Sequence, residues 1–381
     1  MSLPAQCKAL IDIAFDSEIV WNRVEGILNL ESFDLSCTVT STPDQRWAMM
    51  FERNRISISE LVIEYNEQWC KAVDMNKVAY LAHCSSFSVE DPPERKMDLQ
   101  FHFKKNELKL QKPEPFTSQQ LIFVGMRKNG VSSEVMYNGE KIYVKGEKHD
   151  DILRVESEGP LSEDIEHLVY MAFSIYQNGK LTLHAKYDNE FIFLYPAKRE
   201  ISGIDVHFGI YPFNVLWSWL LKENLYKKWM YCIEFFFAGM QKSGSYIDFR
   251  LMNLFVFINA VISINRPHGE KEKFGSEIAQ LLDIDEGDGF WLAYVRNALV
   301  HDGAAIPHAI EKANDEFLKK QTKQGKKLVR YKNFELPTEH PNDRAFLLYC
   351  DIMDLTEAFI MRSAGYTDKW LEIKKRFGLT I

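Results

Sequence analysis

The sequence predicts a two-domain protein: a β-rich α+β domain over residues 1–209, followed by an all-α domain over residues 210–381. Three observations support this division. The chain has 381 residues, more than one ordinary hydrophobic core organises. Up to about residue 209, apolar residues tend to alternate with polar ones, which is the period of a strand. From about Tyr211 they recur every three to four residues, which is the period of a helix.

Three segments of the first domain predict β-hairpins. The clearest is 181–195, where two alternating stretches flank a polar turn. A second surrounds Asn138-Gly139, a dipeptide typical of a two-residue hairpin turn. A third joins 99–103 to 108–110.

Two helices are expected to interrupt these strands. One covers residues 57–73. The other covers 161–177 and begins at Ser162, whose hydroxyl suits a helix N-cap. Four apolar residues of this second helix share one face: Ile165, Leu168, Met171 and Ala172.

The second domain predicts a helical bundle. Glycines separate several of the helical stretches, and one stripe consists of Leu348, Ile352, Leu355 and Phe359. Residues 304–341 contain three prolines and a basic run, so we interpret them as an insertion with a short helix and a strand. The helices are expected at 213–221, 223–241, 246–265, 273–282, 288–301, 343–363 and 366–376.

Composition limits the class of protein. The net charge of −8 means that any site for a polyanion must be a local basic patch. The six cysteines form no CxxC pair, and we expect reduced, buried thiols. The N-terminus is a poor signal peptide, and the apolar stretch 251–264 is too short to span a bilayer. We therefore expect a cytoplasmic protein without a membrane partner.

Several common site motifs are absent. The chain has no GxGxxG, GxxxxGK[ST], GxSxG or HExxH, so it offers no dinucleotide, P-loop, α/β-hydrolase or zincin signature. The acidic run 283–289 fails as a calcium loop, and we expect a polar turn with Asp288 capping the next helix. His83-Cys84 has no second ligand pair, which favours a local structural role.

One segment near the end of a predicted helix carries chemistry. Arg296 is followed directly by Asn297, and His301 comes five positions after the arginine. This helix has a buried stripe of Leu292, Val295 and Leu299, and Gly303 is its C-cap candidate.

The segment resembles the signature of the HEPN superfamily, in which an arginine, a polar neighbour and a histidine stand four to six residues apart. The resemblance rests on Arg296, Asn297 and His301, and extends more weakly to the helices from Phe213 onward. It implies a metal-independent ribonuclease without a cofactor, whose active site forms where two such helices meet in a homodimer. The β-rich first half before this domain is similar in architecture to abortive-infection defence proteins of the ApeA kind.

These residue types suit RNA cleavage. RNA supplies its own nucleophile, the 2′-hydroxyl, and histidine titrates close enough to neutrality to serve as its base. Arginine holds a phosphate through two N–H donors while negative charge develops. The products would be a 2′,3′-cyclic phosphate and a 5′-hydroxyl. Asn297 lies one turn before His301 and is placed to orient the imidazole or the phosphate.

Helix geometry leaves two options for bringing these residues together. Five steps of about 100° place Arg296 and His301 about 140° apart around the axis. Either the helix loosens at His301, or two helices contribute across a symmetric interface; the second agrees with the resemblance and predicts a homodimer. The structural alternative is that Arg296 pairs with Glu286 or Asp302 and that His301 bonds the last carbonyls of its helix.

The basic run after the motif helix is a candidate RNA-binding arm. It contains no acid between residues 319 and 332, and it has an aromatic residue on which an unpaired base would stack. The alternative is a solvated surface loop. The candidate contacts are Lys319, Lys320, Lys323, Lys326, Lys327, Arg330, Tyr331 and Lys332.

A dense aromatic group between residues 213 and 237 predicts buried helix packing rather than a ligand cage. Its members are Phe213, Trp217, Trp219, Tyr226, Trp229, Tyr231 and Phe235 to Phe237.

The expected function is that of an endoribonuclease acting as a toxin or anti-phage effector, with transfer RNA as a target and the first domain as sensor or regulator. An antitoxin or a phage trigger would control it. The alternative is a non-catalytic HEPN-like dimer that binds RNA, a nucleotide or a partner.

Overall fold

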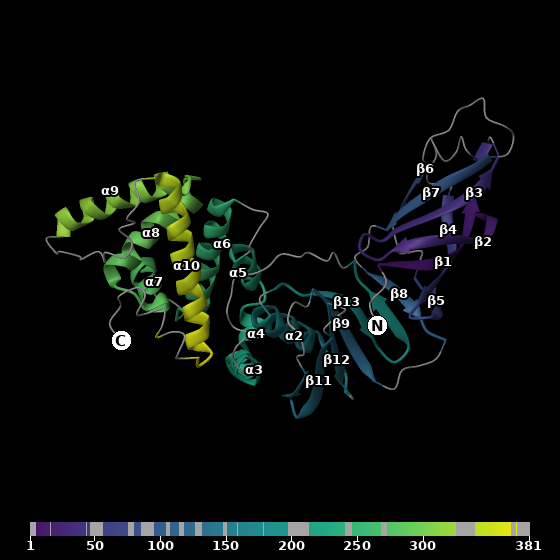
Figure 1. Cartoon of the computed structure of the whole chain (residues 1–381), viewed down its shortest axis with the longest axis horizontal. Helices are drawn as coiled ribbons and strands as arrows, with labels where there is room; N and C mark the ends of the chain where they lie inside the picture. Colours follow the sequence, from purple (N-terminus) through teal and green to yellow (C-terminus); the bar gives the residue numbers. More distant parts are fainter. Residues whose placement is uncertain are drawn as a thin grey trace. The chain divides into compact units, whose positions relative to one another are not determined.

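The computed structural model divides the chain into two compact units, and each is described by itself (Figure 1). The first consists of Met1–Glu166 and Leu181–Glu200, and the second of His167–Lys180 and Ile201–Ile381. The helix near residue 170 thus belongs with the second unit. The structure describes residues 5–15, 17–42, 44–45, 56–74, 80–84, 95–103, 107–113, 118–125, 132–147, 151–157, 159–177, 179–196, 213–240, 246–267, 273–324, 340–366 and 371.

The first unit is built on one large antiparallel sheet. Every strand pairing in its described part is antiparallel, and the order is β10-β11-β12-β9-β13-β14-β8-β5-β4-β1-β2-β3-β7-β6. The strands are β1 (Gln6–Phe15), β2 (Glu18–Asn29), β3 (Asp34–Ser41), β4 (Ile56–Tyr65), β5 (Gln68–Ala72), β6 (Tyr80–Cys84), β7 (Arg95–Phe103), β8 (Leu108–Gln111), β9 (Gln119–Val124), β10 (Ser132–Tyr137), β11 (Glu140–Glu147), β12 (Ile152–Ser157), β13 (Thr182–Tyr187) and β14 (Phe191–Leu194).

Two of the three predicted hairpins are confirmed. β13 and β14 pair through Tyr187 and Ile192 across the expected polar turn. β10 and β11 pair around Asn138-Gly139, and both turn residues have positive φ, 51° and 88°. Positive φ at both central residues is the geometry that matches the twist of the flanking strands.

The third hairpin is wrong in its pairing. β7 and β8 are both strands, but β7 lies between β3 and β6, whereas β8 lies between β14 and β5. β7 and β8 therefore do not form a hairpin. Local sequence specified the two strands, and the partners of each come from distant parts of the chain.

The predicted helix 57–73 is also wrong, because this segment forms β4 and β5. Ile58, Leu61, Ile63 and Tyr65 are buried within β4, which places them on the inner face of the sheet. Asn66 and Glu67 have φ of 50° and 64° and form the tight turn into β5. Glutamates and a lysine on the outer face hid the two-residue period.

The cysteines whose side chains the structure describes form no disulfide: Cys7, Cys37, Cys70, Cys232 and Cys350 all keep their thiols. Cys7, Cys37, Cys70 and Cys232 are buried, and Cys350 is half-buried. Burial raises the pKa of Cys7, Cys37 and Cys232 to about 12, since a thiolate is poorly solvated in an apolar interior. His83 and Cys84 both lie in strand β6, and their side chains are not among the described ones.

The second unit is helical. Its elements are α2 (Glu163–Tyr176), α3 (Phe213–Leu221), the 3₁₀ turn η4 (Lys222–Asn224), α4 (Leu225–Lys228), α5 (Ile233–Gly239), α6 (Ile247–Asn265), α7 (Phe274–Leu282), α8 (Glu286–Val300), α9 (Ile306–Gln324) and α10 (Pro341–Ser363). Ser162 caps α2 as predicted, because its Oγ accepts from the N–H of Ile165. The predicted stripe of α10 is buried. The predicted helix 366–376 falls almost entirely outside the described residues.

Two helical predictions need correction. The segment 223–241 is not one helix but η4, α4 and α5, and Asn224 has a left-handed φ of 55° between the first two. Residues 304–341 do not begin as a short-helix insertion, because α9 runs for 19 residues. Its buried face consists of Ile306, Ala309, Ile310, Ala313 and Phe317. Pro307, the second residue of α9, suits a helix start, since the missing N–H has no partner there.

The aromatic group packs largely as predicted. Trp229 is buried and meets Trp219 edge-on at 5.3 Å and Phe257 at 5.6 Å between ring centroids. Tyr231 and Phe235 depart from the prediction, because they are 81% and 39% exposed. The aromatic residues thus form a core with two exposed members.

Helix α6 is longer than the apolar stretch 251–264, and by length and composition alone it could cross a membrane. It has 19 residues, since the helix extends beyond the apolar run on both sides. In this unit it packs against α5 and α10, with Leu251, Leu254, Phe255 and Ile258 buried.

Candidate active site

Helix α8 carries the motif and is held tightly against α7. Gly289 lies so close that a Cβ there would stand 2.3 Å from the carbonyl oxygen of Gly275 and 2.7 Å from Cβ of Ala279. Asp288 is buried and is not the helix cap that we predicted, because Asp285 is the N-cap residue. On its other side, α8 contacts α9, where Trp291 Nε1 donates to Asn314 Oδ1 at 2.9 Å.

The helix ends at the motif. Val300 is its last residue, and the N–H of His301 donates to the carbonyl of Asn297 at 2.9 Å. Gly303 then takes a left-handed φ of 65°, and the N–H of Ala304 donates to the carbonyl of Ala298 at 3.0 Å. The C-cap residue is therefore His301 and not Gly303, the candidate predicted from the sequence; Gly303 turns the chain two residues later.

Arg296, Asn297 and His301 meet at this helix end. Nη1 of Arg296 lies 2.7 Å from Nε2 of His301 and donates to Oδ1 of Asn297 at 2.9 Å. A guanidinium has only N–H donors, so Nε2 of His301 accepts and the proton of the neutral imidazole is on Nδ1. Asn297 and His301 are exposed and Arg296 is half-buried, so two of the three face solvent.

Of the two ways to bring Arg296 and His301 together, a helix that loosens at His301 or a second helix across an interface, the first is seen within this chain. His301 has φ −96° and ψ −34° just beyond the last helical residue, and its ring contacts Arg296 of the same helix. The angular argument therefore does not require a second helix. A homodimer remains a prediction that depends on the family resemblance alone.

Phe274, the first residue of α7, contributes a contact that the sequence did not reveal. The guanidinium carbon of Arg296 lies 4.9 Å from the centroid of this ring. A cation over an aromatic face gains on the order of 0.5–1 kcal/mol and holds the guanidinium plane in place. Residues 22 positions apart in the chain meet here because α7 and α8 pack side by side, a contact that no local pattern predicts.

The carboxylates considered as structural partners of Arg296 have other partners. Glu286 accepts from Ser276 Oγ at 2.9 Å, and Asp302 accepts from Lys312 Nζ at 2.6 Å. The hydrogen bond from Lys312, together with the positive charge of Lys312, holds the pKa of Asp302 below its ordinary value. Lys312 thus ties the residue directly after His301 to α9.

Removing this lysine is expected to weaken the fold in a pH-dependent way. The folded pKa of Asp302 is depressed, so the pair stabilises the fold above the ordinary pKa of 3.8 and its contribution is lost as the pH falls through the folded pKa. Lys312→Met should lower the melting temperature slightly near neutral pH, and the difference from wild type should shrink toward about pH 3. In the Asp302→Asn background the same substitution should cost nothing at either pH, and a cost that persists there would contradict the assignment.

The basic segment is a helix at its start rather than a flexible arm. Lys319 pairs with Glu316 at 2.7 Å, and that hydrogen bond raises the pKa of Lys319. Lys320 Nζ lies 3.7 Å from the ring centroid of Phe290. Lys323 is the third of the candidate contacts within α9, and its side chain is not among the described ones. The remaining candidates fall outside the described residues: Lys326, Lys327, Arg330, Tyr331 and Lys332.

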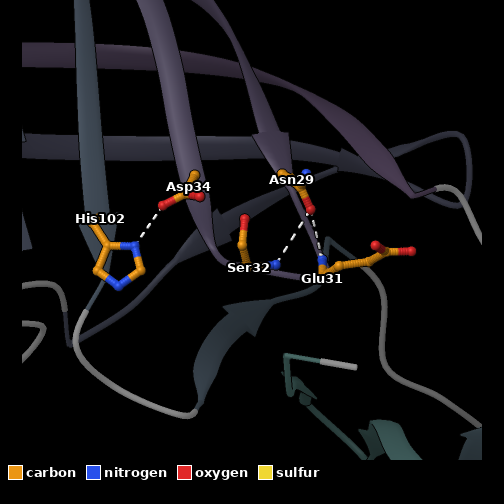
Figure 2. Close-up of polar contacts among 5 residues, drawn as sticks. All are labelled: Asn29, Glu31, Ser32, Asp34 and His102. Atoms are coloured by element: carbon orange, nitrogen blue, oxygen red, sulfur yellow. Dashed lines mark hydrogen bonds and ion pairs between the residues drawn. The ribbon is translucent and has the colours of Figure 1, made fainter. Parts of the chain in front are cut away.

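A second polar cluster, in the sheet unit, has a structural explanation. Asn29 Oδ1 accepts from the N–H groups of Glu31 and Ser32 and shapes the β2–β3 turn, and Asp34 meets His102 of β7 at 2.5 Å (Figure 2). Burial raises the pKa of Asp34, but hydrogen bonds with His102 and Ser32 outweigh it and leave the pKa low. A catalytic triad needs the histidine between serine and aspartate, whereas here the aspartate is the shared partner.

Within the described ranges, no group of three or more His, Cys, Asp or Glu side chains is placed to hold a metal ion. Comparisons with models of protein families, with curated proteins and with solved structures find no match to this chain. The motif and its geometry are therefore the observations from which a function can be argued.

Proposed function

We propose that the helical unit is a HEPN-type endoribonuclease with Arg296, Asn297 and His301 as its reaction centre. The observation that carries the proposal is the convergence of a guanidinium, an amide and an imidazole at one exposed helix end. A cation and a base within one contact distance are the two groups that cleavage by the 2′-hydroxyl needs.

The proposed step starts with the phosphate. A phosphodiester that draws the guanidinium of Arg296 toward its oxygens removes the donor from Nε2 of His301, and the freed lone pair takes the proton of the 2′-hydroxyl. The 2′-oxygen bonds to phosphorus and the bond from phosphorus to the 5′-oxygen breaks, which gives a 2′,3′-cyclic phosphate. The leaving 5′-oxygen takes a proton from water or from an imidazolium, and in the proposed homodimer the second His301 supplies it.

Asn297 has a positioning role in this proposal. Its Oδ1 accepts from the same Nη1 that meets His301, so it holds the guanidinium between the two side chains. Its exposed amide N–H₂ is also free to donate to a phosphate oxygen. Phe274 limits the movement of the guanidinium on its other side.

The biological setting is proposed from the resemblance. A toxin or anti-phage effector that cuts RNA in the cytoplasm, with transfer RNA among its targets, agrees with HEPN domains of this type. The sheet unit then acts as sensor or regulator, and an antitoxin or a phage component as the controlling partner. The lysines of α9 and the basic segment after it would contact the RNA backbone.

The first test measures the chemistry itself. Purified protein should cleave a single-stranded RNA in excess EDTA, and the upstream fragments should carry 2′,3′-cyclic phosphates. The same oligonucleotide with 2′-O-methyl groups at every sugar should resist cleavage by at least about a hundredfold, since it lacks the nucleophile. Cleavage of the methylated strand, or 3′-hydroxyl ends on the fragments, would refute the mechanism.

One observation favours the alternative, a non-catalytic binding protein. Arg296 is half-buried and engages Phe274, Asn297 and His301, which are contacts that a purely structural arginine also makes. Such a protein would bind RNA or a nucleotide without altering it. Retention of intact RNA on immobilised protein, with no new ends after prolonged incubation, would select this alternative.

A further inference from the structure

A hollow of about 950 Å³ lies on the sheet unit, far along the chain from the motif. Strands β1, β2, β3, β5 and β7 form it, and none of the candidate catalytic or RNA-binding residues lines it. A volume in this range is that of sites for small organic ligands. The lining residues are Lys8, Ala9, Leu10, Glu25, Gly26, Ile27, Ser36, Cys37, Thr38, Trp69 and Asp98.

Gly26 lets the lining strands approach closely on the buried face of the sheet, beneath the hollow. A Cβ at Gly26 would stand 2.7 Å from Cδ1 of Ile11 and 2.8 Å from the carbonyl oxygen of Ser36. Such distances leave no room for any other residue. Since Gly26 pairs with Ala9 on one side and Cys37 on the other, the close approach is in the middle of the lining strands.

Apolar surface is exposed in the hollow. Trp69 is 42% exposed and Ile27 is 48% exposed, and Leu10 is half-buried between them in the strand order. An exposed tryptophan presents a flat, rigid ring with a polar N–H, which is a platform for a flat ligand with an apolar face. The ring lies on the face of the sheet that is opposite the core, where a ligand can reach it.

Donors and acceptors alternate around this apolar floor. Thr38 Oγ1 donates to Asp98 Oδ1 at 2.7 Å, and Lys8 lies 3.5 Å from Glu64. Glu25 is exposed, and its carboxylate has no polar partner within the described part of the chain. With Lys8, Glu25 and Asp98 the lining has one cation and two anions, which disfavours a nucleic acid.

Three kinds of ligand can be weighed for an aromatic hollow whose lining has more anions than cations: an extended peptide, a cationic side chain, and a molecule whose groups both donate and accept hydrogen bonds. An extended peptide recognises a sheet by adding to a free edge, but all five lining strands have a neighbour on each side. A cationic side chain would need acceptors only, and Lys8 would repel it. A ligand whose groups both donate and accept matches the mixture of carboxylate, hydroxyl and ammonium.

We propose that this hollow binds an oligosaccharide, with one sugar ring stacked on Trp69 of β5 and the hydroxyls of further rings along the hollow bonded to Glu25, Thr38 and Asp98 of β2, β3 and β7. A pyranose offers the required combination, since one face consists of C–H groups and the rim carries hydroxyls. The site gives the sheet unit a ligand of its own. The inference does not depend on the nuclease proposal.

Affinity electrophoresis of the full-length protein tests it. Native gels would contain soluble starch, hydroxyethyl cellulose, xylan, mannan or dextran, all neutral polymers. At least one should retard the wild type, and Trp69→Ala should weaken the retardation at least tenfold while Trp69→Phe retains most of it. Glu25→Gln should weaken it several-fold, because the amide loses one strong acceptor.

The control is Met136→Ala, which alters an exposed apolar residue of β10, a strand at the opposite end of the sheet order from this hollow. It should behave as wild type, and equal melting temperatures should show that all variants fold. Retardation by none of the five polymers, or retardation unchanged in Trp69→Ala, would overturn the proposal. Salt-sensitive binding of an oligolysine peptide at Trp69 in place of these polymers would overturn it in favour of a basic peptide.

Discussion

His301→Ala is expected to lower RNA cleavage by about a hundredfold to ten-thousandfold, the range that a positioned general base contributes. The imidazole contacts the guanidinium and is a side chain suited to take the proton of the 2′-hydroxyl, whereas the amide of Asn297 is not a base. Single-turnover cleavage of a labelled RNA in EDTA measures the loss. His301 is exposed, so the variant should keep the melting temperature of the wild type.

The matched control is His308→Ala. This histidine lies on α9, is exposed, and stands 3.7 Å from Glu311 rather than beside the guanidinium. Its removal should leave cleavage within about twofold of wild type, as expected for a surface change away from the reacting groups. Equal losses in both variants, or full activity in His301→Ala, would show that cleavage arises elsewhere or from a contaminant.

Arg296 is expected to resist conservative replacement. Arg296→Ala should cost about a hundredfold to a thousandfold, the usual effect of removing one donor to developing charge. Arg296→Lys should recover little, because an ammonium cannot present the planar pair of donors and cannot reach Nε2 of His301 and Oδ1 of Asn297 in the same way. Recovery by lysine to near wild-type rates would indicate that only a positive charge is needed.

Sequence patterns predicted the parts of the fold in which the information is local. Asn138-Gly139 specifies a turn by its own backbone preferences, and Ser162 caps a helix through its own hydroxyl. The helical period of α10 could be recognised in the sequence because the residues on one face of the helix are uniformly apolar. The segment 57–73 failed because its outer face carries glutamates and a lysine at spacings that also suit a helix, and burial on one face of a sheet decided the outcome.

The candidate site could likewise be predicted only as far as its residues lie close together in the sequence. Arg296, Asn297 and His301 lie within six residues, so spacing identified them, and helix geometry correctly raised the question of how they meet. Phe274 and Lys312 come from neighbouring helices, and only packing brings them to the motif. The hollow around Trp69 combines five strands spread over ninety residues, which no single stretch of sequence reveals.

Gly289→Ala is expected to destabilise the helical unit by about 2–3 kcal/mol, and Gly289→Val by more, because the added carbons would overlap backbone rather than a flexible side chain. The Cβ would meet the carbonyl oxygen of Gly275 at 2.3 Å and the backbone nitrogen of Ala279 at 2.9 Å. Alanine is the better helix former by about 1 kcal/mol, and this gain is already included in the expected net loss. To relieve the overlap, α7 and α8 must move apart along the faces that now exclude water.

The same displacement should reach the motif. Gly275 follows Phe274 directly, so a shift of this part of α7 moves the ring on which Arg296 rests. Urea unfolding followed by far-ultraviolet circular dichroism would measure the stability, and single-turnover cleavage at low temperature, where the variant is still folded, would measure the site. Gly365→Ala is the control, because it has a positive φ of 90° but open space around its Cα and should cost only about 1 kcal/mol. If Gly289→Ala were no more harmful than that control, the close contact between α7 and α8 would be wrong, and with it the positioning of Arg296 by Phe274.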